Sequence, residues 1–416
     1  MGAFTAQNNK ENRGFGIAPV AGDFLILEYI ESLNRPANSE NSSIVVSHVV
    51  HSFRPSPFSM KAGTASGNCN INVACPEGSG KNNAINSVAL LINGKGDSFC
   101  TGAMINNAEN DGRQLFLTAE HCIGGSDVRN FMVGFHYQFK YCNSAYETKP
   151  QTRTVHGTML LDKSDVTDYA VLEVIESIPD EWDVYMSGWD ATASTLRTGS
   201  FYGIHHPSGD TKKVSLYTSQ LDLVRLTDMG NGVNFWRVAK WDKGVTEPGS
   251  SGSPLFDSNG LIIAHLLGGE SSCSHPKSPD YYGALSRDWV LSGNPITKYL
   301  NPNNKNLLQV QGAPLKQLRG PSSSETIPNE IAASDASSTA IITVTQTILR
   351  TSTITQTIAK STVYITSRVT ITAPGTTSTT TKEVTKTVTT PLTITQTLTL
   401  KPPPVTKTVT VLKIKS

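Results

Sequence analysis

Short apolar segments recur through the middle of the chain, and turn-forming residues separate them. Each segment spans five to seven residues, a length typical of β-strands, and several alternate between apolar and polar positions. Glycine, proline and asparagine are frequent between them, as expected for turns. Short strands at this spacing predict an all-β barrel or sandwich. The segments lie at 87–92, 114–118, 169–174, 200–204 and 261–267.

Composition divides the 416 residues into four parts. Residues 1–61 contain two strand-like segments and no cysteine. Residues 62–305 contain every cysteine and every tryptophan, and we expect them to form the main domain. Residues 306–338 read as a polar linker, and residues 339–416 as a threonine-rich, low-complexity tail.

The tail permits two interpretations. Threonine alternates with valine, isoleucine or leucine, and this period of two is typical of strands. A threonine-rich tract punctuated by proline is equally typical of an extended, O-glycosylated stalk. We favour the stalk because Tyr364 is the tail's single aromatic residue, so a packed core would be poor.

Charge and hydropathy exclude several classes of partner. The 35 basic and 34 acidic residues give a net charge of +1, so we expect no nucleic acid and no general attraction to membranes. A membrane-spanning helix needs about 20 apolar residues. The longest apolar stretch, at 260–269, is too short and contains His265, so we expect no membrane span. We expect a monomer.

The six cysteines predict disulfide bonds. Their number is even and no Cys-x-x-Cys pair occurs, which argues against zinc and thioredoxin-like sites. Disulfides imply an oxidising compartment, and we therefore expect a secreted protein. Six cysteines allow 15 pairings, and spacing does not choose among them. They are Cys69, Cys75, Cys100, Cys122, Cys142 and Cys273.

The first residues do not match this expectation. Residues 1–13 lack the apolar core of a signal peptide. We expect that the true start of translation is missing from this sequence, with unconventional export as the alternative.

A histidine at the end of an apolar strand is the first candidate for chemistry. The segment 116–118 leads through Glu120 to His121 and Cys122. A strand end fixes the imidazole in place, and a neutral imidazole can accept a proton near pH 7. A structural role is the alternative, and it is the commoner one for an isolated histidine.

A glycine- and serine-rich turn offers a nucleophile. Gly249, Ser250, Ser251 and Gly252 precede an apolar strand. The Ser251 hydroxyl is the candidate nucleophile, and the amides of Gly249 and Ser251 could form an oxyanion hole. An ordinary serine-rich loop is the alternative.

An aspartate before the strand at 169–174 completes the set. Asp168 directly precedes the apolar run, which is why we prefer it to Asp165 and Asp162. A carboxylate in this place could orient an imidazole and stabilise its charged form. Ordinary turn chemistry is the alternative.

The order histidine, aspartate, serine is the chymotrypsin order, and it differs from that of subtilisin or the α/β-hydrolases. It predicts a hydrolase that transfers an acyl group from a protein or peptide substrate to Ser251, with His121 as base and Asp168 orienting it. No cofactor and no metal are implied. His205 and His206 could be read as metal ligands, but no companion acid or cysteine lies at ligand spacing.

Several phrases resemble the lysyl endopeptidase branch of the trypsin-like serine proteases. They span residues 66–300 and include the segments at 69–78, 100–103, 117–122, 188–190, 204–207 and 244–254. The resemblance implies two six-stranded antiparallel β-barrels of the chymotrypsin type, with the triad at their junction. It also implies the disulfides Cys69–Cys273, Cys75–Cys142 and Cys100–Cys122.

The resemblance also implies a preference for lysine. Val245 stands where trypsins carry an acid, whereas Asp280 precedes a Tyr-Gly pair as in lysyl endopeptidases. We expect Asp280 to pair with a lysine ammonium, with Gly268, Gly269 and Trp189 lining the substrate site. A pocket that also accepts arginine, a neutral pocket, and a surface position for Asp280 are the alternatives.

Two positions depart from the family pattern. Leu267 replaces a histidine that often packs on the tryptophan of Gly-Trp-Asp, here Trp189. Glu120 is charged where a small residue is usual, and its charge should raise the pKa of His121.

The N-terminal region resembles the end of a β-rich propeptide, which implies a zymogen. Cleavage after Lys61 would release the mature domain at Ala62, and a lysine-specific enzyme could make this cut itself. Outside enzymes, the tail is compatible with a wall-associated binding protein whose protease domain has lost its activity.

Overall fold

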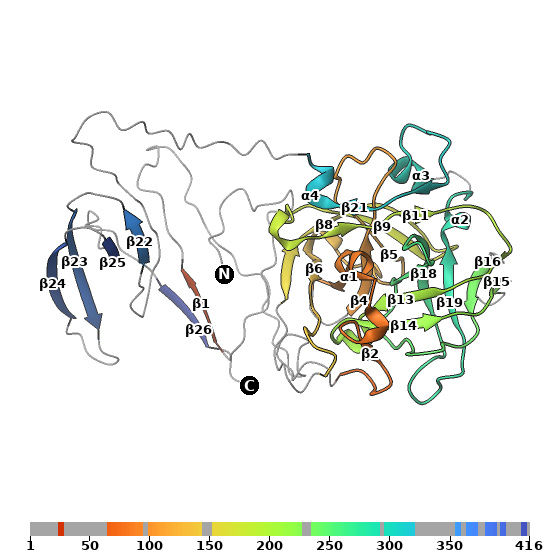
Figure 1. Cartoon of the computed structure of the whole chain (residues 1–416), viewed down its shortest axis with the longest axis horizontal. Coiled ribbons are helices and arrows are strands. Elements are labelled where there is room, and N and C mark those ends of the chain that lie inside the picture. The colour runs from red at the N-terminus through yellow and green to blue at the C-terminus, as the bar shows by residue number, and fades with distance from the viewer. Residues whose placement is uncertain are drawn as a thin grey trace. The chain divides into compact units, whose positions relative to one another are not determined.

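The computed structural model describes residues 65–94, 99–143, 152–226, 234–291 and 295–320 (Figure 1). Outside these ranges it describes only strand backbones: β1 (Phe24–Glu28), β22 (Ile354–Ile358), β23 (Val363–Thr372), β24 (Thr379–Val388), β25 (Leu392–Gln396) and β26 (Val409–Lys413). Lys61 and Ala62 lie outside the described residues, as does most of the proposed linker.

The first large sheet is antiparallel and has seven strands. Their order is β7-β6-β3-β4-β5-β9-β8. Every residue of β3 and of β5 is buried, so both strands are covered on their two faces. The strands are β3 (Val88–Ile92), β4 (Phe99–Met104), β5 (Leu115–Ala119), β6 (Met132–Phe135), β7 (Arg153–His156), β8 (Thr158–Ser164) and β9 (Tyr169–Val174).

The second sheet has eleven strands and lies beside the first (green and teal in Figure 1). Its main path runs β12-β15-β16-β19-β18-β17-β13-β14-β2, with β11 and β20 attached to β18. The strands are β2 (Ile71–Asn72), β11 (Trp189–Asp190), β12 (Leu196–Arg197), β13 (Phe201–His205), β14 (Lys213–Tyr217), β15 (Leu221–Arg225), β16 (Asn234–Val238), β17 (Pro254–Phe256), β18 (Ile262–Gly269), β19 (Asp280–Ala284) and β20 (Gln309–Val310).

The all-β class is confirmed, but six strands in each barrel are not found. Four of the eleven strands in the second sheet, β2, β11, β12 and β20, have two residues each. A strand of two residues is too short to carry a periodic signal in the sequence. The expectation of two six-stranded barrels therefore undercounts the paired segments.

Helices are few and short in the described part. They are α1 (Asn82–Ser87), α2 (Leu285–Asp288), α3 (Pro295–Leu300) and α4 (Leu315–Leu318), with 3-10 turns at η2 (Pro76–Gly78), η3 (Val128–Asn130), η5 (Asp180–Trp182) and η6 (Pro207–Gly209). Within the described residues, none of the helices has the length and apolar character needed to span a bilayer.

Among the described residues, buried apolar side chains form two clusters on the first sheet, one on the second and a fourth where the sheets meet. The cluster at the junction combines Leu117 and Val171 of the first sheet with Ile204, Val214 and Ile262 of the second, all buried. Each such side chain contributes about 2 kcal/mol through burial. The junction is therefore a packed core, and residues at the strand ends beside it have fixed positions.

The domain extends beyond residue 305. Val310 and Leu315 are buried, β20 pairs with β11, and β21 (Ala313–Pro314) pairs with β10 (Tyr185–Met186). The sequence places these residues in a polar linker because polar neighbours surround the two apolar side chains. Residues 309–318 instead pack on the main domain.

In the tail, β23 and β24 pair antiparallel over ten residues each, and β22 pairs with β25. These strands follow the alternation of threonine with branched apolar residues.

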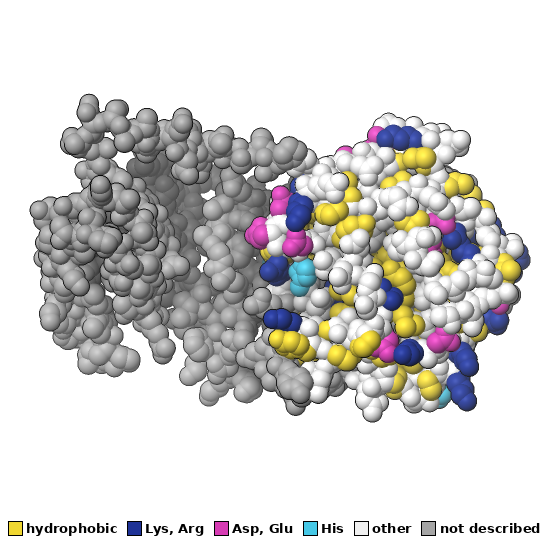
Figure 2. All heavy atoms as spheres, in the orientation of Figure 1, with side chains coloured by type: hydrophobic (Ala, Val, Ile, Leu, Met, Phe, Trp, Pro, Cys, Tyr) yellow, Lys and Arg dark blue, Asp and Glu magenta, His cyan; other side chains and the backbone are white. Residues whose placement is uncertain are grey.

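On the domain face shown in Figure 2, acidic and basic side chains are interspersed, in keeping with the balanced charge.

Candidate active site

His121 and Asp168 meet because their strands are neighbours. Ala119, at the end of β5, pairs with Tyr169, at the start of β9, so the residues just beyond them come together. Nδ1 of His121 lies 2.7 Å from Oδ2 of Asp168, and the His121 amide donates to Oδ1 at 2.9 Å. The His121 side chain is 44% exposed and that of Asp168 is 6% exposed. The imidazole thus faces solvent while its partner is buried.

Asp168 has a left-handed backbone, with a φ of +61°. This conformation is unfavourable for a non-glycine residue, and surrounding contacts must maintain it. The Glu120 amide donates to the Asp168 carbonyl at 2.9 Å, in addition to the two bonds from His121. The strain is therefore held at the residue that orients the imidazole.

The pKa of His121 is raised above its usual value. The hydrogen bond to Asp168 is the largest cause, and the negative charges of Asp168 and Glu120 add to it, while burial opposes the shift. Glu120 is itself paired with Lys163, at 2.7 Å. The charged imidazolium is favoured, as a general base requires after it has taken a proton.

The nucleophile loop, defined here as residues 245–253, lies against the strand end that carries His121. The Thr101 amide donates to the Ser251 carbonyl at 2.8 Å, and Sγ of Cys122 lies 3.7 Å from the same oxygen. A Cβ on Gly252 would come within 2.6 Å of the Ala119 amide nitrogen. The loop is therefore packed directly onto the turn that leads to His121.

Within the ranges that the structure describes, the Ser251 hydroxyl has no hydrogen-bond partner. Among the described residues it forms no hydrogen bond with the His121 imidazole. Such bonds are often long before a substrate binds, and they shorten in the complex.

The amides of Gly249 and Ser251 are also unpaired within the described part of the chain. Those of Ser250, Gly252 and Ser253 donate to the carbonyls of Glu247, Leu266 and Ser250. Gly249 has a φ of +94°, and a Cβ there would lie 2.9 Å from the His206 carbonyl oxygen, so only glycine fits. Two free amides beside a free hydroxyl are what an oxyanion hole requires.

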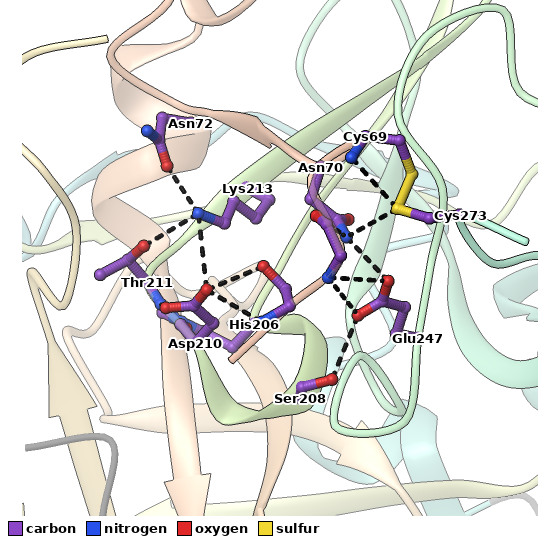
Figure 3. A network of polar contacts seen from close by, with 12 residues as sticks. Cys69, Asn70, Asn72, His206, Ser208, Asp210, Thr211, Lys213, Glu247 and Cys273 are labelled. Carbon is purple, nitrogen blue, oxygen red and sulfur yellow. Dashed lines mark hydrogen bonds and ion pairs between the residues drawn. A yellow bond between two sulfur atoms is a disulfide. The ribbon is translucent and has the colours of Figure 1, made fainter. Parts of the chain in front are cut away.

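A carboxylate links this loop to the N-terminal segment of the domain (Figure 3). Glu247 accepts from the Gly67 amide at 3.1 Å, from Nδ2 of Asn70 at 3.0 Å and from the Ser208 hydroxyl at 3.1 Å. The sequence analysis did not single out Glu247, because its partners are about 40 to 180 residues away along the chain.

Asp280 is wholly buried at the start of β19. Its Oδ2 accepts from Nε1 of Trp241 at 2.6 Å, from the Thr246 hydroxyl at 2.8 Å and from the Ser271 hydroxyl at 2.7 Å. Its Oδ1 is buried and has no hydrogen-bond partner among the described residues. Burial raises the pKa of Asp280, while the side chains of Ser271, Trp241 and Thr246 and the backbone of Ser271 oppose this shift. A surface position for Asp280, one alternative left by the sequence, does not occur.

The two glycines expected in the substrate site lie opposite Asp280. In the pairing of β18 with β19, Gly269 faces Asp280 and Gly268 faces Tyr281. A Cβ on Gly269 would lie 2.3 Å from Oδ1 of Asp280, whereas a Cβ on Gly268 would meet nothing within 4 Å. Oδ1 of Asp280 thus lies next to the backbone of Gly269, which has no side chain.

Trp189 does not join these residues. It is fully buried, its ring packs on Trp289 at a centroid distance of 4.8 Å, and its Nε1 donates to the Asn106 carbonyl at 2.9 Å. We correct the expectation that it lines the substrate site, since the resemblance carried over the residue type but not its surroundings. Trp189 is a core residue.

The remaining candidates have other partners. Asp162 accepts a hydrogen bond from the Tyr169 hydroxyl, so it does not compete with Asp168 for His121. Val245 is buried in place of the acid that trypsins carry. Both ring nitrogens of His205 face serine hydroxyls, and Nδ1 of His206 faces the Asp210 carbonyl. Donor atoms of Cys100, His121 and Cys122 lie within 4.8 Å of one another, but the two sulfurs form a disulfide.

The structure joins Cys69 to Cys273, Cys75 to Cys142 and Cys100 to Cys122. This is the pairing that the resemblance implies. Cys100–Cys122 fixes the residue after His121 to β4, and Cys69–Cys273 fixes the N-terminal segment near Glu247. Three disulfides indicate folding in an oxidising compartment.

Comparison with known proteins identifies the family of the domain. The family described as "Lysyl endopeptidase, C-terminal domain" matches residues 63–283, more than half of the chain. The lysyl endopeptidase of Pseudomonas aeruginosa is 31% identical over 309 residues, which cover 70% of this chain. The match spans 64% of the length of that relative.

Solved structures with some likeness include Rv3671c of M. tuberculosis H37Rv in its inactive form, with a TM-score of 0.35, 17% identity, and coverage of 56% of this chain and 98% of the other. The HtrA-type protease AlgW with a tripeptide has a TM-score of 0.36, 17% identity, and coverage of 50% and 60%. The fold described above rests on the strand pairings and not on these likenesses. By the match over residues 63–283, the chain belongs to the family of the lysyl endopeptidase C-terminal domain.

Proposed function

We propose that this protein is a secreted serine endopeptidase that cleaves peptide bonds after lysine. The observation that carries the proposal is the pairing of His121 with Asp168 beside a loop that offers a free Ser251 hydroxyl and two free amides. A hydroxyl, a base and a hydrogen-bonding site for an oxyanion are the parts that acyl transfer needs.

The reaction follows from these parts. The Ser251 oxygen attacks the carbonyl carbon of the peptide while Nε2 of His121 takes the hydroxyl proton. The amides of Gly249 and Ser251 bind the oxyanion, and Asp168 stabilises the imidazolium. The imidazolium then protonates the leaving amine, which departs. Water, deprotonated by His121, attacks the acyl-enzyme and releases the carboxylic acid with Ser251 restored.

The preference for lysine rests on the free Oδ1 of Asp280. A buried carboxylate oxygen without a partner is costly, and an ammonium group would both pair with it and neutralise it. Lysine carries a compact charge on a flexible stem, whereas arginine needs a planar, two-pronged acceptor. Oδ2 already accepts three hydrogen bonds, so the carboxylate presents one oxygen, which suits lysine better.

A fluorophosphonate probe tests the class of enzyme. The wild-type protein should react stoichiometrically at Ser251, and Ser251→Ala and His121→Ala proteins should not. A folded wild-type protein that fails to react would contradict the proposal and would indicate a binding protein that has lost its activity.

Digestion of a peptide mixture tests the specificity. Cuts should follow lysine in the wild type and should be lost in Asp280→Ala. Cuts after arginine at a similar rate, or cuts that persist in Asp280→Ala, would contradict the assignment of Asp280.

We further propose that residues 1–61 are a propeptide and that the mature enzyme cuts after Lys61 to begin at Ala62. We also propose that the threonine-rich tail, residues 339–416, carries O-linked glycans on its threonines. A Ser251→Ala protein made alone should keep its N-terminal region, and added wild-type enzyme should remove it. Cutting of the Ser251→Ala protein in the absence of active enzyme would show that another protease is responsible.

A further inference from the structure

His205 lies at the end of β13 with no exposed surface, and it plays no part in the reaction as described. Its Nδ1 is 2.8 Å from the Ser250 hydroxyl oxygen, and its Nε2 is 3.0 Å from the Ser215 hydroxyl oxygen. Ser250 is the residue between the two candidate oxyanion amides. The imidazole therefore contacts the nucleophile loop from its buried side.

The direction of every hydrogen bond in this chain can be assigned. The Ser215 hydroxyl donates its one proton to the Val245 carbonyl at 2.8 Å, so Nε2 of His205 must donate to the Ser215 oxygen. Nδ1 of a neutral imidazole is then an acceptor, and it accepts from the Ser250 hydroxyl. The Ser250 oxygen in turn accepts from the Glu247 amide at 3.2 Å.

Only the neutral imidazole satisfies all of these groups. A proton on Nδ1 would face the Ser250 oxygen and leave the Ser250 hydroxyl proton without its acceptor. Burial, aided by the charge of Lys213, lowers the pKa of His205 to about 3. The neutral form therefore persists throughout the pH range in which a His121 base can act.

The next residue supports the same loop through its backbone. The His206 amide donates to the Thr101 hydroxyl oxygen at 3.0 Å, and that hydroxyl donates to the Gly249 carbonyl at 2.8 Å. Gly249, through its carbonyl, and Ser250, through its hydroxyl, are thus both attached to the end of β13. Figure 3 shows His206 beside Asp210, whose carbonyl oxygen lies 2.8 Å from Nδ1 of His206.

We propose that neutral His205 is a positioning residue that fixes the nucleophile loop, through Ser250 and through Ser215 to Val245, so that the amides of Gly249 and Ser251 point at the oxyanion. The inference rests on the proposed function of that loop. His205 exchanges no proton with the substrate. Its effect passes mainly through Ser250, and the Ser215 contact holds the imidazole in its orientation. A loop that moved by 1 Å would cost about 100-fold in rate.

Two substitutions separate the two ends of the imidazole. In His205→Asn the amide oxygen replaces Nδ1 and can still accept from Ser250, whereas in His205→Gln the amide nitrogen replaces Nε2 and can still donate to Ser215. We expect His205→Asn to retain activity within about threefold. We expect His205→Gln and Ser250→Ala to lose about tenfold or more in kcat with little change in KM, because the interaction acts in the transition state.

The decisive measurement compares two inhibitors that end in lysine. A peptide aldehyde adds to Ser251 and forms an oxyanion, whereas the matching peptide alcohol occupies the same subsites without one. His205→Gln and Ser250→Ala should weaken aldehyde binding about tenfold or more and alcohol binding less than threefold. Equal weakening of both inhibitors, or unchanged aldehyde binding, would overturn the proposal.

Ser187→Ala is the matched control. It removes a buried hydroxyl that bonds to the Ser87 hydroxyl at 2.8 Å, outside the nucleophile loop, so it should lower stability without changing the aldehyde-to-alcohol ratio. Should the His205 variants fail to fold, Ser250→Ala still decides the question, since it deletes the one hydroxyl that lies against Nδ1 of His205. A wild-type protein that does not react with fluorophosphonate would instead refute the proposed function.

Discussion

The free oxygen of Asp280 lies against the backbone of Gly269, so closely that a Cβ on residue 269 would come within 2.3 Å of Oδ1. Because residue 269 is a glycine, no side chain covers this buried oxygen from β18. A side chain at this position would occupy the place that we assign to the lysine ammonium.

Gly269→Ala should raise KM for lysine substrates about tenfold or more, because the added methyl group blocks Oδ1 of Asp280. Fluorophosphonate labelling of Ser251 should continue at the wild-type rate, since that probe does not need the pocket. Gly134→Ala serves as the control, because a Cβ there would make an ordinary contact at 3.5 Å. An unchanged KM in Gly269→Ala would place the lysine elsewhere.

Asp280→Asn should stabilise the free enzyme at neutral pH. The folded-state pKa of Asp280 lies above its unfolded value, chiefly because of burial. The wild type thus loses stability as the pH rises from below the unfolded pKa through the folded pKa, whereas the asparagine has no charge to bury.

Urea unfolding at pH 4 and pH 8, in a Ser251→Ala background that prevents self-digestion, would measure this effect. The asparagine variant should gain more at pH 8 than at pH 4. A variant less stable than its parent at pH 8 would mean that the carboxylate is well solvated by its three donors.

Glu120→Gln should move the acidic limb of the kcat/KM profile to lower pH. The neutral form of His121 is the active base, so activity falls as the pH drops through the raised pKa of His121, and the charge of Glu120 contributes to that rise. High salt should move the wild-type limb in the same direction, since Glu120 pairs with Lys163 near the surface.

The control is Glu173→Gln, which removes another ion-paired glutamate, the partner of Arg113. Its limb should coincide with that of the wild type. If the Glu120→Gln limb also coincided, Asp168 alone would set the pKa of His121.

Gly252→Ala should abolish most activity, by about 100-fold or more, and lower the free energy of unfolding by about 2–3 kcal/mol. Its φ is +78°, and a Cβ would lie 2.3 Å from the Thr118 hydroxyl oxygen and 2.5 Å from the Thr101 carbonyl oxygen. The loop would have to move away from β5.

Gly80→Ala isolates the backbone part of this cost. Its φ is +75°, but nothing lies within 4 Å of the added Cβ, so we expect a loss of about 1 kcal/mol and full activity. Denaturant titration and kcat measurements compare the two. Equal stability and equal activity in both variants would show that the loop tolerates displacement.

Local sequence predicts the residues that lie at the ends of apolar strands. His121 and Asp168 can be located in this way because β5 and β9 are buried runs with clear boundaries. Ser251 stands out because glycines flank it in a short motif. In each case the reactive side chain lies within a few residues of the local pattern that predicts it.

Other features depend on contacts between segments that are distant in the sequence, so no local pattern predicts them. Glu247 reaches Gly67 across 180 residues, and His205 reaches Ser250 across 45. The sequence offers His205 and His206 only as an adjacent pair without companion ligands, and the role of His205 depends on direction, because successive residues of a strand end point in different directions. Trp189 is the reverse case. Its motif is local, but the core that buries its ring is built by distant segments such as the one that carries Trp289.

The Cys69–Cys273 bond has a consequence for an enzyme that is surrounded by copies of itself. Any single nick between these two cysteines leaves both pieces in one covalent molecule, because the bond spans 204 residues. Autolysis within that span would then pass unnoticed on a gel run without reductant and would appear as fragments only after reduction. A gel run with reductant is therefore needed to judge whether a preparation of the protein is intact.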